Sequence, residues 1–139
     1  MSLLLEYTVT ARRVDSSGSV AGAKSAEVVL DTSLAGRLDA LNPAELLLAS
    51  LAACMIKGAE RVAPMLNFEL RGMSVRLHAV RADSPPSIKT IDYELTVESD
   101  ESERRLELLH TNIRKFGTIS NTLAAALQLT GSIRRADNL

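Results

Sequence analysis

The sequence predicts an α+β fold with a mainly antiparallel sheet, and three observations support this. Segments with the period-two pattern of strands precede and follow one long apolar segment, and two helical patterns come late in the chain. Strands and helices do not alternate as parallel βαβ units would. The 139 residues are 46% hydrophobic and 24% charged, which is typical of one globular domain with its own core. We therefore expect a single domain over residues 1–139.

The first expected elements are strands within residues 1–31. Apolar side chains occupy the odd positions from Leu3 to Ala11, and Arg13 continues that parity. Because alternate side chains of a strand point to opposite faces, the odd positions, Arg13 included, are expected to face the core. Residues 15–18, Asp-Ser-Ser-Gly, predict a turn into weaker strand patterns that continue to residue 31.

A long helix is expected over residues 43–64. Asn42 is a suitable N-cap, Pro43 suits the first helical position, and Pro64 ends the pattern. The first half is apolar around nearly its whole circumference, so protein must enclose it on all sides. A chain of 139 residues can scarcely do so alone, and we expect this buried central helix to require a second subunit. The apolar residues are Leu46, Leu47, Leu48, Leu51, Ala52, Ala53, Met55 and Ile56.

A long antiparallel hairpin is expected over residues 68–98, with a rigid loop, Asp-Ser-Pro-Pro-Ser, at 83–87. Its second arm alternates cleanly between apolar and polar residues from Ile91 to Glu98. The first arm changes parity near Gly72, which predicts a β-bulge there. The arms exceed the usual strand length, which favours pairing beyond one subunit.

Two helices are expected within residues 100–127, and a final strand is expected over residues 129–135. Ser99 or Asp100 can cap the first helix, and Gly117 is its natural C-terminal stop. The apolar residues before Gly117 recur at helical spacing, so they are expected to share one face.

Composition and charge argue against several classes of function. The net charge is -1 and the chain has two Tyr, two Phe and no Trp, so we expect no nucleic-acid partner. The most apolar stretch, residues 44–56, is shorter than the roughly 20 residues that a membrane span needs. The N-terminus lacks a secretory signal pattern, so a cytoplasmic protein with no membrane partner is expected. One Cys and two His predict no metal site, and no cofactor is expected.

The one cysteine, Cys54, lies near the end of the run NPAELLLASLAACM at residues 42–55. This run closely resembles the signature of the OsmC/Ohr family of thiol-dependent hydroperoxide reductases. The segments Arg81–Pro86 and Phe116–Leu123 resemble the family as well. The resemblance implies an intertwined α+β homodimer with two sites at the subunit interface. It also implies that Cys54 is the peroxidatic nucleophile and that an Arg and a Glu assist it.

Two positions depart from the family pattern. Family peroxidases carry a second, resolving Cys where this chain has Gly117. The resemblance therefore implies a one-cysteine member that depends on an external thiol reductant. Many peroxidase members have Glu directly after the Pro, where this chain has Ala44, and Glu45 follows one place later.

The candidate catalytic residues are Cys54, Arg13 and Glu45. A thiolate attacks the peroxide O–O bond, and an Arg near the sulfur can stabilise both the thiolate and the leaving oxygen. Arg13 is favoured for this part because its strand parity points inward, and Arg12 and Arg37 are its rivals.

Glu45 precedes Cys54 by nine residues, which on a straight helix is about 13.5 Å of rise and half a turn of rotation. The two side chains cannot touch within one helix. Glu45 therefore acts through an intervening Arg or from the other subunit, or else it only stabilises the first helical turn. Gly117, Ser120 and Asn121 are candidates for lining the pocket, and Ser120 and Asn121 could instead serve the start of the last helix.

The leading hypothesis is a peroxidase that reduces organic or hydrogen peroxide through Cys54 and is recycled by an external thiol. A second hypothesis is a non-catalytic homodimer that binds a small apolar ligand at its interface. A third is a one-cysteine redox sensor. His78 and His110 have no ligand partner at a suitable spacing and are expected to be structural or solvated.

Overall fold

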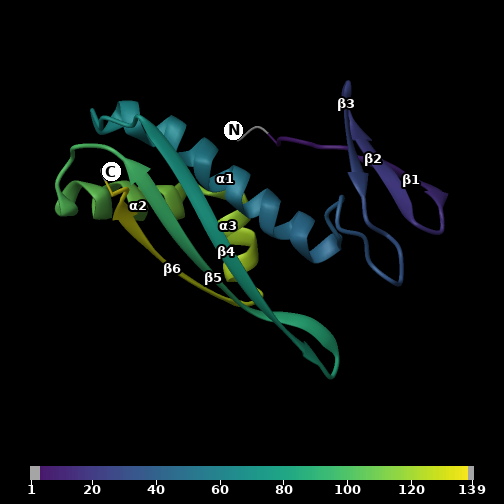
Figure 1. Ribbon diagram of the computed structural model, residues 1–139. Helices are drawn as coiled ribbons and strands as arrows, with labels where there is room; N and C mark the ends of the chain where they lie inside the picture. The colour runs from purple at the N-terminus through teal and green to yellow at the C-terminus, as the bar shows by residue number, and fades with distance from the viewer. Residues whose placement is uncertain (1–3, 138–139) are drawn as a thin grey trace. The chain divides into compact units, whose positions relative to one another are not determined.

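The computed structural model describes residues 4–137 and contains two compact units (Figure 1). Unit 1 is Met1–Leu47 and unit 2 is Leu48–Leu139. The long helix α1 (Pro43–Met65) spans the boundary, with its first turn in unit 1 and the rest in unit 2. Each unit is described by itself.

Unit 1 is a three-stranded antiparallel meander. Its strands are β1 (Thr10–Asp15), β2 (Gly18–Ala23) and β3 (Ala26–Leu30), paired in that order. The turn expected at residues 15–18 joins β1 to β2, and Asp15 Oδ1 accepts hydrogen bonds from Ser17 N at 2.8 Å and Ser17 Oγ at 2.6 Å. Such a bond to a nearby backbone N–H is what favours Asp at the start of a turn.

The expected first strand is wrong in its start and in its buried face. Pairing begins at Thr10, opposite Gly22, and Leu3 lies outside the described residues. All six residues of β1 are exposed, and before the strand Leu5, Tyr7 and Val9 are 75, 81 and 64% exposed. The physical reason is that a three-stranded meander has no second layer within its own unit to cover either face.

Helix α1 begins and ends close to the expected residues 43 and 64. Asn42 caps it by accepting a hydrogen bond from Glu45 N through Oδ1 at 2.8 Å. Beyond its C-terminal end at Met65, Asn67 adopts a φ of 50° and Phe68 N donates to Ala63 O at 2.8 Å, which closes the last turn. One face of the helix is buried, at Leu51, Met55, Ala59, Val62 and Ala63.

The sheet of unit 2 contains β4 (Gly72–Asp83), β5 (Pro86–Glu98) and β6 (Gln128–Arg135), side by side in that order (Figure 1). The β4–β5 pair is the expected antiparallel hairpin. The β5–β6 pair is parallel. Parallel neighbours need a crossover connection, and the two helices between them supply it.

The β-bulge expected at Gly72 is elsewhere, between Val80 and Arg81. The burial pattern gives the reason. Odd-numbered side chains of β4 are half-buried up to Ala79, and after the shift the half-buried position is even, at Ala82. The parity change before Gly72 reflects only that the strand starts there.

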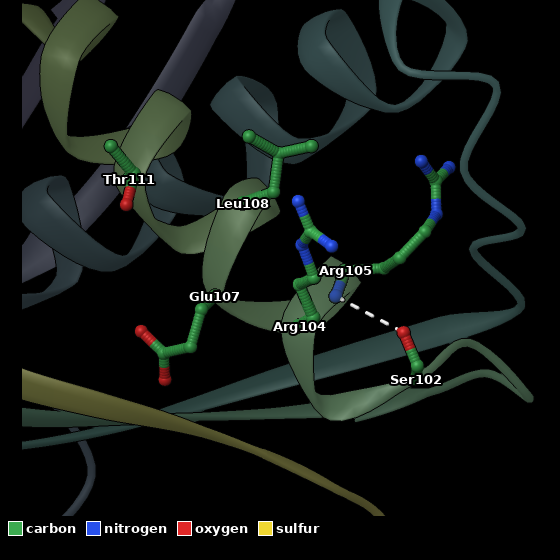
Figure 2. A pocket seen from close by; sticks show the side chains of 6 residues that line it. All are labelled: Ser102, Arg104, Arg105, Glu107, Leu108 and Thr111. Carbon is green, nitrogen blue, oxygen red and sulfur yellow. Dashed lines mark hydrogen bonds between the residues drawn. The ribbon is translucent and has the colours of Figure 1, made fainter.

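The crossover consists of α2 (Glu103–Phe116) and α3 (Thr118–Ala124). Ser102 caps α2 in place of the expected Ser99 or Asp100, and its Oγ accepts from Arg105 N at 3.3 Å (Figure 2). Ser99 is buried and its Oγ accepts from Glu101 N at 3.1 Å, so it shapes the turn before the helix. Gly117 is the C-cap of α2, as expected.

The hydrophobic core described by the structure gathers in unit 2. It joins one face of α1, alternate residues of β5 and one face of α2, with contributions from β6. The α+β fold class and the mainly antiparallel sheet are confirmed. Among the helices in residues 4–137, none is long and apolar enough to cross a membrane. The fully buried members of the core include Leu51, Met55, Ile91, Leu95, Val97, Leu106, Leu109 and Ile113.

Candidate functional site

Cys54 is a free cysteine in the middle of α1, and it is half-buried. Leu51 and Met55, close to it on the same helix, are at most 1% exposed and belong to the core, whereas Ala53 is exposed. Because successive helical residues are rotated by about 100°, Cys54 lies at the edge of the buried face. The thiol therefore borders the core without being sealed in it.

Two contacts show where α1 and α2 approach each other. Near the end of α1, the carbonyl of Leu66 accepts a hydrogen bond from Arg105 Nη2 at 2.6 Å, close to the start of α2. Farther along, a Cβ placed on Gly58 would lie 3.7 Å from Ile113 Cγ2. Moving backward on α1 thus corresponds to moving forward on α2, as in an antiparallel helix pair. Gly58 follows Cys54 by one helical turn on α1.

Gly117 is buried at the junction of α2 and α3. Its φ of -81° suits any residue, so backbone conformation does not require glycine here. Space does: a Cβ at this position would lie 2.9 Å from Ser120 Oγ and 3.0 Å from Ile113 O. A cysteine side chain at 117 would therefore displace its neighbours.

Ser120 and Asn121 differ in what they contact. Ser120 is 1% exposed, and its Oγ has no hydrogen-bond partner within the described chain. Asn121 is exposed and donates from Nδ2 to Lys115 O at 3.3 Å, which satisfies a carbonyl in the last turn of α2. Asn121 thus has a structural contact, whereas the Ser120 hydroxyl has none.

Glu45 belongs to the cap of α1. Its Oε1 accepts from Asn42 N at 2.9 Å, while its own N–H donates to Asn42 Oδ1 at 2.8 Å. This reciprocal pair is a capping box, with an acidic residue in the first turn where the helix dipole favours it. The structure therefore gives Glu45 the stabilising role that the sequence left open as one alternative.

Arg12 and Arg13 lie next to each other in β1, opposite Val20 and Ser19 of β2. Neighbouring strand residues point to opposite faces, so their side chains leave the sheet on different sides. Both are exposed, and Arg13 does not have the buried position that its parity predicted. Within residues 4–137 neither forms an ion pair with a carboxylate.

Arg37 is held inside unit 1. Its guanidinium pairs with Asp39 through Nε–Oδ1 at 2.7 Å and Nη2–Oδ2 at 2.9 Å, and its backbone N donates to the buried Asp31 at 2.9 Å. The Ser33 hydroxyl and then the Arg37 N–H hold the pKa of Asp31 below its ordinary value. Arg37 therefore has a structural role in the loop between β3 and α1.

A buried polar cluster that the sequence did not predict lies between α2 and the sheet of unit 2. Tyr93 Oη and His110 Nε2 are 2.6 Å apart, and Arg114 Nη1 donates to the same phenol oxygen at 3.0 Å. Burial lowers the pKa of His110 and the charge of Arg114 acts in the same direction, whereas Glu107 opposes them. Gly131 makes room for the Tyr93 ring, which a Cβ there would strike. The sequence signal for this cluster was the spacing of His110 and Arg114, because residues four apart on one helix lie on the same face.

A shallow hollow runs along the first turns of α2 (Figure 2). It is open to solvent, and Arg105 on its wall is already paired with Glu101 at 2.9 Å. Figure 2 shows the Arg104 and Arg105 side chains leaving the helix in different directions, so they do not form one cationic cradle. Within the described residues, no group of three or more His, Cys, Asp or Glu is placed to hold a metal ion. The residues that line the hollow along α2 are Ser102, Arg104, Arg105, Glu107, Leu108 and Thr111.

Comparison with known proteins identifies the family. The model of the OsmC-like protein family matches residues 35–131, more than half of the chain and the part that contains Cys54. The chain therefore belongs to the OsmC-like protein family. No curated protein matches the sequence.

Solved structures show the same fold at low sequence identity. An OsmC-like protein from Mycoplasma pneumoniae is 20% identical with a TM-score of 0.89, and the match covers 97% of this chain and 100% of that one. An organic hydroperoxide resistance protein OsmC from Legionella pneumophila is 18% identical with a TM-score of 0.75, covering 95% and 98%. The organic hydroperoxide resistance protein OhrB of Bacillus subtilis is 20% identical with a TM-score of 0.68, covering 95% and 100%.

Proposed function

We propose that this protein is a thiol-dependent peroxidase that reduces organic or hydrogen peroxide through Cys54. The observation that carries the proposal is the position of Cys54, a free thiol at the border of the core within the family-matched segment. The names of two structural relatives, both organic hydroperoxide resistance proteins, support the substrate class. The expected cytoplasmic location stays a prediction.

The chemistry needs one protein sulfur and two external thiols. The Cys54 thiolate attacks a peroxide oxygen, so that an S–O bond forms as the O–O bond breaks, and the leaving alkoxide takes a proton to become an alcohol or water. The sulfenic acid is then attacked by an external thiol, which forms a mixed disulfide and releases water. A second external thiol releases the disulfide and restores Cys54. Gly117 supplies no second thiol, so no intramolecular disulfide competes.

The direct test is the intact mass of the protein after one equivalent of cumene hydroperoxide, with dimedone as a trap. A dimedone adduct on Cys54 is expected, and the Cys54→Ser variant should form none. An unmodified wild-type chain that leaves the peroxide unconsumed would show that Cys54 is not the nucleophile.

Arg13 and Glu45 stay proposed assistants of Cys54. If Arg13 stabilises the thiolate, Arg13→Ala should slow alkylation of Cys54 by iodoacetamide at neutral pH, and the neighbouring Arg12→Ala should not. Equal rates in the wild-type chain and both variants would show that activation does not come from β1. Glu45→Gln keeps an acceptor for Asn42 N, so a loss of peroxidase rate in that variant would assign it a role beyond the cap.

We also propose that the working form is a homodimer. The support is uncovered apolar surface: Leu5, Tyr7 and Val9 before β1 are exposed, and Ile56 on α1 is exposed although it lies beside core residues. Obligate interfaces bury about 2,000 Å² or more of such surface. Sedimentation should give twice the chain mass of 15.0 kDa at micromolar concentration. A stable folded monomer would contradict the proposal.

A second candidate function is a non-catalytic homodimer that binds a small apolar ligand. It is favoured by one set of observations: Arg37 is engaged by Asp39, and Glu45 is engaged by the cap of α1. Neither side chain is free to serve a thiolate in these arrangements. Peroxide left unconsumed, together with saturable binding of an apolar fluorescent probe that Cys54→Ser leaves unchanged, would favour this candidate over the peroxidase.

A further inference from the structure

We propose that Tyr93, His110 and Arg114 form an acid-released latch, which holds the crossover of α2 and α3 on the sheet of unit 2. The crossover joins the end of β5 to the start of β6 (Figure 1). The latch is closed when the imidazole of His110 is neutral, and the uptake of one proton opens it. The proposal is independent of the peroxidase function, because the contacts that form the latch do not include Cys54.

The first support is the place of the Tyr93 phenol, where three elements meet. Tyr93 lies opposite Gly131 in the β5–β6 register, and its ring occupies the space that a Cβ on Gly131 would need. The phenol oxygen is 2.6 Å from His110 Nε2 and 3.0 Å from Arg114 Nη1, both on α2. Arg114 Nη1 also donates to Leu129 O of β6 at 3.4 Å. These contacts join the C-terminal half of α2 to both strands.

The second support is the count of donors and acceptors around the phenol. A guanidinium nitrogen only donates, so Arg114 uses the phenol oxygen as its acceptor. Tyr93 is 3% exposed, and within residues 4–137 its oxygen forms hydrogen bonds with these two partners alone. The phenol proton therefore goes to His110 Nε2, which accepts it only when the imidazole is neutral and carries its own proton on Nδ1. The closed arrangement requires a neutral His110.

The charges on α2 disfavour an imidazolium at this place. Burial lowers the pKa of His110, and the positive charge of Arg114 acts in the same direction. Glu107 opposes them, with Oε2 3.8 Å from His110 Nδ1. Its side chain is 68% exposed, so water screens its attraction for the ring.

The elements packed against α2 add no carboxylate that faces His110 among the described residues. On β5 the core-facing neighbours of Tyr93 are the apolar Ile91 and Leu95, and α3 has no charged residue. On β6 the charged residue of the core-facing parity is Arg135, whose Nη2 donates to the carbonyl of Glu101 before α2 begins. The charged residues of α1 within unit 2 are exposed, and they are Lys57, Glu60 and Arg61.

Protonation of His110 removes the acceptor of the phenol proton. The imidazolium only donates, so the Tyr93 oxygen then faces two donors and its own proton has no acceptor in the cluster. An unpaired buried polar hydrogen is unfavourable, and so is an imidazolium beside Arg114. Opening relieves both, because water then reaches the imidazole and the phenol. It also exposes apolar side chains that α3 and the turn after it pack against the core, namely Ile119, Leu123 and Leu127.

The release has a defined pH range. In the open state His110 titrates near its ordinary pKa of about 6.5, whereas in the closed state burial holds its pKa lower. The closed state is therefore fully favoured above about pH 6.5 and loses stability relative to the open state as the pH falls below it. The equilibrium constant for opening rises by at most about tenfold per pH unit, because one proton is taken up.

The arrangement of protons is tested by nitrogen-15 NMR of the imidazole. The chain has two His, so His78→Gln leaves His110 as its one imidazole. At pH 7.5 the ring should carry its proton on Nδ1. Adding Tyr93→Phe should raise the pKa of His110, because it removes the phenol that donates to the neutral ring. A proton on Nε2, or the same titration with and without Tyr93→Phe, overturns the latch.

The release is tested by hydrogen exchange of the full chain, with rates corrected for the intrinsic effect of pH. Amides of residues 108–124 should exchange at least about tenfold faster than the central amides of β5, because the crossover opens without the hairpin. Below pH 6.5 their opening constant should rise toward tenfold per pH unit. His110→Gln can accept the phenol proton but does not titrate, so it should abolish the rise. The matched control is His78→Gln, which removes an exposed imidazole of β4 and should keep the rise.

The two exchange measurements decide for or against the latch. Faster exchange in the crossover, with a rise that His110→Gln alone abolishes, supports it. Equal exchange in the crossover and β5 would show that α2 and α3 leave the sheet only when unit 2 unfolds, which overturns it. A rise that persists in His110→Gln would belong to other groups and overturns it as well. Tyr93→Phe gives a second reading that does not depend on the folding of His110→Gln: the rise should shrink in it, and an unchanged rise contradicts the proposal.

Discussion

The two units of the chain are stabilised in different ways. In unit 2 the faces of two helices and alternate residues of β5 bury a continuous apolar core. In unit 1, Ala21 is the one buried hydrophobic residue among those described, and the buried carboxylate of Asp31 organises the loop after β3 through hydrogen bonds to Ser33 and Arg37. A meander with this few buried apolar groups needs cover from another surface to bury its apolar side chains.

The candidate site residues are divided between the two units. Cys54, Gly117 and Ser120 are in unit 2, whereas Arg13 and Arg37 are in unit 1. Cys54 therefore belongs to the unit that has the apolar core. Arg13, its proposed assistant, belongs to the unit that has almost no core.

The largest expected effect is on the core of unit 2. Leu95→Ala, at a fully buried position of β5, should lower the free energy of unfolding by about 2–5 kcal/mol, because it removes apolar contacts and leaves a cavity. Leu38→Ala, at a fully exposed position of unit 1, should change it by less than about 0.5 kcal/mol. Urea unfolding measures both. Equal losses of unfolding free energy in the two variants would mean that Leu38 belongs to a buried core in unit 1.

The next effect concerns the cover that unit 1 lacks. Val9→Asp should weaken the proposed dimer at least tenfold, about 1.4 kcal/mol, because it places a charge on the exposed apolar side chains before β1. Thr8→Asp adds the same charge one residue away, on the polar parity, and serves as the control. Sedimentation over a range of concentrations measures the dissociation constants. The same constant for both variants would show that this segment lies outside the interface.

Acid should weaken unit 2 through His110. Burial lowers its pKa in the folded protein, so below the ordinary value of about 6.5 the unfolded chain binds more protons than the folded chain. The stabilisation is therefore complete above about pH 6.5 and is lost as the pH falls below it, with a slope of at most about 1.4 kcal/mol per pH unit. Urea unfolding between pH 7.5 and 5 measures this slope, away from the carboxylates, which titrate near pH 4. His110→Gln should reduce the slope of the unfolding free energy against pH. An unchanged slope would show that other groups cause the pH dependence.

The smallest effect is at Ser120. Ser120→Ala should raise the free energy of unfolding by about 1 kcal/mol, because it removes a buried hydroxyl that has no partner. Gly117→Ala, which puts a Cβ against that hydroxyl and Ile113 O, should lower it instead. Differential scanning calorimetry resolves the two signs. A loss of stability in Ser120→Ala would show that the hydroxyl is paired in the folded protein.

Elements with local signals were predictable from the sequence, and elements set by distant pairing were not. The N-cap at Asn42 and the Pro residues at both ends give α1 its bounds within about a residue. The parity of residues 3–13 indicated an apolar face, yet β1 starts at Thr10, whose partner is Gly22, because β2 continues only one residue further, to Ala23. The parallel direction of β6 depends on the crossover by α2 and α3, which no local pattern encodes.

The candidate site residues also divide into those that a local sequence signal predicted and those that depend on distant packing. The cap role of Glu45 was readable, because Asn and Glu stand three residues apart at a helix start. The exposure of Arg13 could not be predicted, because alternation along a strand does not show which face of the sheet another element covers. The Tyr93–His110–Arg114 cluster joins a residue of β5 to two of α2, so its pairing follows from how the helix packs on the sheet.

The central claim is that Cys54 reduces peroxide and that an external thiol recycles it, and a titration of peroxide consumption tests this most directly. Without thiol, the wild-type chain should consume about one equivalent of cumene hydroperoxide and then stop, since one sulfur accepts one oxygen in the reversible step. With excess dithiothreitol, consumption should continue over many equivalents, and Cys54→Ser should consume none above the rate of dithiothreitol alone. Consumption by Cys54→Ser at the wild-type rate, or none by the wild-type chain, would contradict the claim.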